Sequence, residues 1–221
     1  MQLFCKFKRL WLYNRTAIWT RPKINQNQSK SIIMKKLLLL CSFVFASCTN
    51  AQQDNQAKTT PTQVSILSVD TNEIYKLAQE SDKKNTLFYT FGIWCEPCCL
   101  HLPTAIKVSK DYDLNFYVLV VDQEGSDKVT RAVDYLQKID KNIKIAILKD
   151  SVYGTKTQKR NTKFVTEITP PQFEMIDDFS KYILLNNKGK VIMVTNWKDN
   201  PGDWRDDSDM VQNKIVPLLK N

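Results

Sequence analysis

The stretch FGIWCEPCCLHLP, Phe91 to Pro103, decides how the rest of the chain is interpreted. It holds three cysteines within five positions and His101, the only histidine among the 221 residues. The run just before it, Thr86 to Gly92, is continuously apolar and aromatic, as expected of a strand buried on both faces. From Cys95 to about Lys110 the pattern is helical. The sequence therefore predicts a buried strand, a short turn and a helix that opens with a Cys-x-x-Cys pair.

A cysteine at a helix start is reactive for an electrostatic reason. The unpaired N–H groups of the first turn and the positive end of the helix dipole stabilise a thiolate at Cys95, and the thiolate is the nucleophile. Cys98 lies one turn further on, within disulfide reach, and is suited to resolve a mixed disulfide. Pro97 fits in the first turn, where its missing N–H costs nothing. Glu96 opposes the helix dipole, so we expect a less stabilised thiolate than in strong oxidants, which favours a reductase.

The motif WCEPCCLHLP resembles the WCxPCxxExP signature of the TlpA/ResA/DsbE-type thioredoxin-like proteins, which are exported, membrane-tethered thiol–disulfide oxidoreductases. The match lies at Trp94, Cys95, Pro97, Cys98 and Pro103. The resemblance implies an α/β, thioredoxin-like fold over residues 62–221, catalysis by Cys95 and Cys98, and no cofactor. It also implies a disulfide-containing envelope protein as client and a membrane dithiol carrier that recycles the active site.

Two positions depart from that signature. His101 stands where the family has Glu, and it is either a proton carrier for Cys98 or a solvated histidine. The family also has a cis-proline before the first strand of its last hairpin, whereas the residues before Tyr182 include none. Pro170 and Pro171 are the candidates, with Pro171 the supporting residue if PPQFEMIDD is an insertion.

Alternatives to the redox pair remain open. Cys95 and Cys98 could instead form a structural disulfide. Cys99 is either a small buried residue, a second resolving thiol or a metal ligand. Cys95, Cys98, Cys99 and His101 together could form a copper or zinc module, because thiolates and imidazole are suitable ligands. A peroxidase-like redoxin is a third reading, prompted by DFSKY at 178–182.

The leader is recognisable by its order. MKKLLLLCSFVFASC, 34–48, has two lysines, an apolar run too short for a membrane helix, and small residues before Cys48, as in a secretory signal with a lipobox. We therefore expect residues 1–33 to be an upstream extension, present because the start codon was assigned too early. The alternative is that they form an amphipathic basic anchor. We expect a signal peptide at 34–47, a lipid anchor on Cys48, a flexible tether at 48–61 and the folded domain at 62–221. Such a protein would be a periplasm-facing lipoprotein of the cell envelope, where disulfides persist.

The net charge of +9 comes from the leader. Nine of the 32 Lys and Arg residues lie in 1–47, which has no Asp or Glu, and the remaining 23 balance the 23 acidic residues. The body of the protein is neutral, so its charge gives no support to a nucleic-acid partner.

The remaining pattern predicts a central mixed sheet with helices on both faces. Strands are expected at 62–69, 114–122 and 143–148, helices at about 70–84, 127–139 and 206–219, and a hairpin at 181–195, with 149–169 a polar segment. Trp197 and Trp204 are expected to pack, and the acidic run DNPGDWRDDSD, 199–209, is expected to be a solvated loop rather than a calcium loop.

Overall fold

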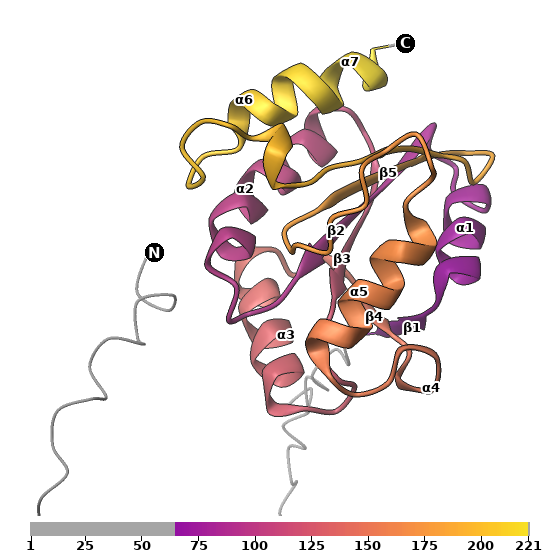
Figure 1. Cartoon of the computed structure of the whole chain (residues 1–221), viewed down its shortest axis with the longest axis vertical. Helices are drawn as coiled ribbons and strands as arrows, with labels where there is room; N and C mark the ends of the chain where they lie inside the picture. Colours follow the sequence, from indigo (N-terminus) through magenta and orange to yellow (C-terminus); the bar gives the residue numbers. More distant parts are fainter. Residues whose placement is uncertain (1–64, 221) are drawn as a thin grey trace, which may run out of the picture. The chain divides into compact units, whose positions relative to one another are not determined.

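The computed structural model describes residues 65–220 of the protein. The expected extension at 1–33, the signal peptide, Cys48 and the tether lie outside the described residues. Within them the chain forms a six-stranded sheet in the order β1-β4-β3-β2-β5-β6 (Figure 1). The strands are β1 (Ile66–Val69), β2 (Asn85–Phe91), β3 (Asn115–Val120), β4 (Lys144–Leu148), β5 (Tyr182–Asn186) and β6 (Val191–Val194). Strands β1, β4, β3 and β2 are parallel to one another, β5 is antiparallel to β2, and β6 is antiparallel to β5.

Helices cover both faces of the sheet, so the predicted α/β class with a central mixed sheet is confirmed (Figure 1). The longer helices and one short helix are α1 (Thr71–Gln79), α2 (Glu96–Asp111), α3 (Asp127–Ile139), α4 (Asp150–Tyr153) and α5 (Thr157–Ile168). After β6 come the 3-10 turn η1 (Trp197–Asp199) and then α6 (Ser208–Met210), the π-helical η2 (Val211–Ile215) and α7 (Val216–Leu219). The last three follow one another directly. One core lies under α2, α3 and the C-terminal helices, and the other under α1, α4 and α5. Among residues 65–220, no helix is long and apolar enough to cross a membrane.

Strand β2 lies inside the sheet and is buried on both faces. All seven of its residues are buried, with a paired strand on each side. Side chains alternate along a strand, so Leu87, Tyr89 and Phe91 enter the core under α2, whereas Phe88 enters the core under α1 and α5. Cys95 follows shortly after the end of β2, so this buried strand sets the position of Cys95 relative to the sheet.

Several predicted boundaries agree closely with the structure. The Asp70 side chain caps α1 through a reciprocal capping box with Glu73, as the Asp-Thr start predicts. Helix α3 spans 127–139 as expected. The hairpin turns at Gly189, where φ is +74°, a backbone conformation that favours glycine.

The expectation of a polar segment at 149–169 is wrong, because α4 and α5 lie there. Phe164, Val165 and Ile168 face the core from α5. The buried face of α5 was not predicted because it includes Arg160, a charged residue that is fully buried. Its guanidinium donates to the carbonyls of Val121, Leu148 and Gly154 and to the carboxylate of Asp150, which satisfies a group otherwise excluded from the interior.

Candidate functional site

The candidate site forms where three strand ends meet. Strands β2 and β3 are parallel, so their carboxyl ends lie at one edge of the sheet, and antiparallel β5 begins at that same edge. Cys95 follows β2, Asp122 follows β3, and the segment 178–181 precedes β5. The join between β2 and this segment is direct: Thr90 N–H donates to Lys181 O at 3.0 Å, and Lys181 N–H donates to the Thr90 hydroxyl at 2.8 Å.

Cys95 and Cys98 occupy the positions that the sequence predicts for a nucleophile and a resolver. Cys95 is the N-cap of α2 and is joined to Cys98 by a disulfide. Its Sγ accepts the backbone N–H of Cys98 at 3.2 Å, so an unpaired N–H of the first turn points at this sulfur. Cys95 is 7% exposed and Cys98 is fully buried, so only the first sulfur faces the surface. Pro97 lies in the first turn, and Glu96 is exposed there.

Trp94 is held against the wall of the site. Its Nε1 donates to the buried carboxylate of Asp122 at 2.7 Å, and its ring packs edge-to-face on Phe179 with centroids 4.9 Å apart. Lys128 Nζ lies 5.6 Å from the ring centroid, within the range of a cation–π contact. A side chain at Gly92 would come within 2.9 Å of the indole, so this position leaves room only for glycine.

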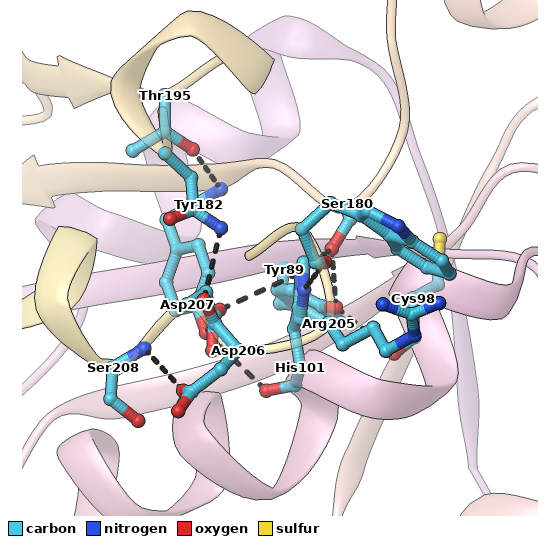
Figure 2. Close-up of polar contacts among 12 residues, drawn as sticks. Tyr89, Cys98, His101, Ser180, Tyr182, Thr195, Arg205, Asp206, Asp207 and Ser208 are labelled. Atoms are coloured by element: carbon cyan, nitrogen blue, oxygen red, sulfur yellow. Dashed lines mark hydrogen bonds and ion pairs between the residues drawn. The ribbon is translucent and has the colours of Figure 1, made fainter. Parts of the chain in front are cut away.

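A buried polar network lies behind the disulfide, centred on His101 (Figure 2). His101 Nδ1 is 2.9 Å from Ser180 Oγ and 3.7 Å from Asp207 Oδ2, and its Nε2 is 2.8 Å from the Trp204 carbonyl. Ser180 Oγ is 2.7 Å from the hydroxyl of Tyr89, which lies 3.0 Å from the Cys98 carbonyl. His101 is 8% exposed, so the interpretation of a solvated histidine is wrong.

Sequence reasoning missed the partners of His101. Asp207 belongs to an acidic run that was expected to be solvated, yet it is 1% exposed and accepts the Tyr182 hydroxyl at 2.6 Å. Ser180 has φ of +65°, and no sequence pattern marks that conformation at a serine. No local pattern in the sequence marks Asp207 as buried, because it lies more than 100 positions from His101 in an acidic run.

A groove of about 420 Å³ opens beside Cys95. Its lining includes Trp94, Cys95, His101, Phe179, Trp197 and Trp204. The expectation that Trp197 and Trp204 pack into the interior is wrong, because they are 63% and 43% exposed. The short turn η1 and the loop before α6 instead present these indoles at the groove. The arrangement combines a sulfur within reach of a ligand with aromatic side chains around it.

Pro171 is not part of this arrangement. Every peptide bond of the described residues is trans, so Pro171 is not a cis-proline. It is exposed in the turn that follows α5 and is absent from the groove lining. From the segment that precedes β5, Phe179 and Ser180 line the groove instead.

The donors proposed for a metal do not converge. Cys99 is buried with its Sγ 3.8 Å from the Ile93 carbonyl, and both His101 nitrogens face protein oxygen atoms. Over residues 65–220, no group of three or more His, Cys, Asp or Glu side chains could hold a metal ion. The geometry therefore gives the copper or zinc reading no support.

Comparison with models of known protein families and with curated protein sequences finds no match to the chain. An assignment of function therefore depends on the geometry of the site and on the motifs of the sequence.

Proposed function

We propose that the protein is a thiol–disulfide oxidoreductase with a thioredoxin-like fold, of the TlpA/ResA/DsbE type, that reduces disulfides of exported proteins. The position of one sulfur atom carries the proposal. Cys95 Sγ lies at the N-terminus of α2, accepts an N–H of its first turn, and lines an open groove, while its partner Cys98 is fully buried behind it. A structural disulfide needs none of these three features.

The exchange consists of two displacements at sulfur. In the reduced protein the Cys95 thiolate attacks one sulfur of the client disulfide; the other client sulfur leaves as a thiolate and takes up a proton. Cys98 then loses its proton and attacks Cys95 Sγ, which releases the first client sulfur as a thiolate. Two electrons pass from the cysteine pair to the client. A membrane dithiol carrier, itself oxidised to a disulfide, returns two electrons and two protons to the pair.

The groove favours a polypeptide client with apolar side chains near its disulfide. Three exposed indoles, those of Trp94, Trp197 and Trp204, line it and offer apolar area with a polar edge. Glu96 is exposed beside the helix N-terminus and weakens the stabilisation of the Cys95 thiolate, which favours electron flow toward the client.

The leader supports an envelope location for this activity. The signal-like order of 34–47 and the lipobox-like Cys48 favour a lipid-anchored, periplasm-facing protein, in a compartment where clients carry disulfides. Anchoring would also bring the site near a membrane carrier.

Trapping of the mixed disulfide tests the proposal. A Cys98→Ala, Cys99→Ala chain keeps the nucleophile but lacks both nearby thiols, so it should accumulate mixed disulfides with envelope proteins. Mass spectrometry should map them to Cys95, and dithiothreitol should release them. The matched Cys95→Ala, Cys99→Ala chain should form none at this site. Absence of adducts at Cys95 in the first variant would overturn the mechanism.

A further inference from the structure

Four hydrogen bonds form one continuous chain between two backbone carbonyls beside the disulfide. Figure 2 shows the part of this chain that joins Cys98, Tyr89, Ser180 and His101. The chain runs from the Cys98 carbonyl to the Tyr89 hydroxyl, then to Ser180 Oγ, then to His101 Nδ1, and from His101 Nε2 to the Trp204 carbonyl. The four distances are 3.0, 2.7, 2.9 and 2.8 Å. Each bond needs one hydrogen, and the carbonyl oxygens at the two ends supply none.

Counting hydrogens gives the charge on the ring. A phenol and a hydroxyl supply one hydrogen each, so a neutral imidazole with one N–H leaves three hydrogens for four bonds, whereas an imidazolium completes the set. We propose that His101 is held as the imidazolium cation by the buried carboxylate of Asp207, which makes Asp207 a positioning residue of the active site. Burial raises the pKa of Tyr89 well above that of an ordinary tyrosine, so its hydroxyl keeps its single hydrogen.

Asp207 has the position that a counter-ion needs. Its Oδ2 lies 3.7 Å from His101 Nδ1 and accepts the Tyr182 hydroxyl at 2.6 Å. Its Oδ1 is buried and has no hydrogen-bond partner within residues 65–220. An isolated carboxylate is very unfavourable in such a place, whereas a carboxylate paired with a cation is tolerated.

The other charges around His101 are less well placed to serve as the counter-ion. Asp206 interacts electrostatically with His101, but it is exposed and accepts the Ser208 N–H. Asp178 pairs with Lys181, and Glu96 and Arg205 are exposed. Solvent screens the exposed charges. Tyr182 faces the pair from β5 as a neutral phenol, because burial raises its pKa well above the ordinary value. The buried charge that balances the imidazolium is therefore that of Asp207.

The charged ring holds four segments around the disulfide: helix α2, strand β2, the turn before β5 and the loop before α6. Loss of its proton leaves three hydrogens for the four bonds, so one of the bonds that join these segments is lost. The inference rests on the proposed function only in naming Cys98 as the resolving cysteine. The charge state itself follows from the hydrogen count.

The single histidine makes the test direct. The oxidised full chain, labelled with 15N-histidine, gives one imidazole whose two nitrogen signals report whether each carries hydrogen. At pH 7.5 an ordinary histidine is about one-tenth protonated. We expect both His101 nitrogens to carry hydrogen at that pH. A spectrum with one bare nitrogen would overturn the proposal, and this wild-type measurement needs no variant to fold.

A matched pair of variants tests the assigned counter-ion. Asp207→Asn should leave one nitrogen without hydrogen at pH 7.5, whereas Asp206→Asn, its exposed neighbour, should leave the spectrum unchanged. An imidazolium that persists in Asp207→Asn would overturn the role of Asp207. The outcome is separable from the proposed function: an imidazolium in a chain without disulfide exchange would refute only that function, and a neutral imidazole in an active chain would refute only this inference.

Discussion

The Trp94 indole and the Asp122 carboxylate are joined by a hydrogen bond of 2.7 Å that spans the ends of two parallel strands. Trp94 immediately precedes Cys95, and Asp122 follows β3. Asp122 is fully buried and also accepts the Thr157 hydroxyl at 2.8 Å, while Lys128 Nζ lies 3.5 Å away. One carboxylate therefore fixes the residue before Cys95 to the sheet and to α5.

Replacing Asp122 tests how much this bond contributes. In Asp122→Asn the amide N–H₂ replaces one of the two carboxylate oxygens, so either the Trp94 indole or the Thr157 hydroxyl loses its acceptor. We therefore expect the free energy of unfolding to fall by about 1–3 kcal/mol. Urea denaturation followed by tryptophan fluorescence measures it. Asp127→Asn is the control, because its pair with Arg131 is exposed and should contribute less than about 0.5 kcal/mol. Equal losses in the two variants would show that the buried carboxylate has no special role.

Cys99 is predicted to be dispensable for exchange. It is buried, takes no part in the disulfide, and is absent from the groove lining. Cys99→Ala should retain disulfide-reductase activity within about twofold and lower stability by roughly 1 kcal/mol, since a small buried side chain loses one heavy atom. Activity on a disulfide-bonded protein substrate measures it, with Cys98→Ala as the inactive comparison. Loss of turnover in Cys99→Ala would instead assign it a resolving role.

Trp197 is predicted to contribute to client binding. Its indole is 63% exposed at the groove. Trp197→Ala should raise KM about fivefold with little change in kcat, because the lost contact of about 1 kcal/mol acts on binding and the sulfur atoms are untouched. Met175→Ala is the control, since Met175 is exposed and apolar but outside the groove lining. The interpretation fails if the two variants change KM alike, or if kcat alone falls.

Stability should fall at high pH because three buried tyrosines resist ionisation in the folded protein. Burial raises the pKa of Tyr89, Tyr153 and Tyr182 above the ordinary value of 10.0. Above about pH 10 the unfolded chain loses these protons while the folded chain keeps them, so each group lowers the free energy of unfolding by up to about 1.4 kcal/mol per pH unit.

One group opposes this trend. Burial lowers the pKa of Lys181, so the unfolded chain binds more protons there and stability rises with pH as 10.5 is approached. One lysine does not offset three tyrosines, and denaturation in urea at pH 8.5, 10 and 11 should show a net fall. Tyr153→Phe should make the fall shallower between pH 10 and 11. An unchanged slope in that variant would contradict the assignment.

Much of the fold could be predicted because local patterns dominate there. The apolar run of β2, the capping residues of α1 and the glycine of the hairpin each act over a few residues, and each led to the observed element. Helix α5 could not be predicted in the same way. Arg160 made its inner face look polar, and only its long-range carbonyl partners explain how a guanidinium is buried there.

The candidate site likewise has one part that local sequence patterns predict and one part that depends on long-range contacts. The placement of Cys95 and Cys98 followed from the order of strand and helix, whereas the partners of His101 lie 79 and more positions away in the chain. Asp207 looked like one more residue of an acidic surface run. Its burial depends on Tyr182 and His101, which come from a strand and a helix that are distant in sequence.

The reduction potential of the Cys95–Cys98 pair distinguishes a reductase from a protein with a structural disulfide. Equilibration of the full chain with dithiothreitol buffers of known ratio, followed by alkylation and mass spectrometry of the peptide with Cys95 and Cys98, gives the value. Exchange-active pairs span about −270 to −120 mV, and a reductase lies near the lower limit. We predict a value near −270 mV. A value well below about −300 mV would identify a structural disulfide and rule out disulfide exchange at this pair.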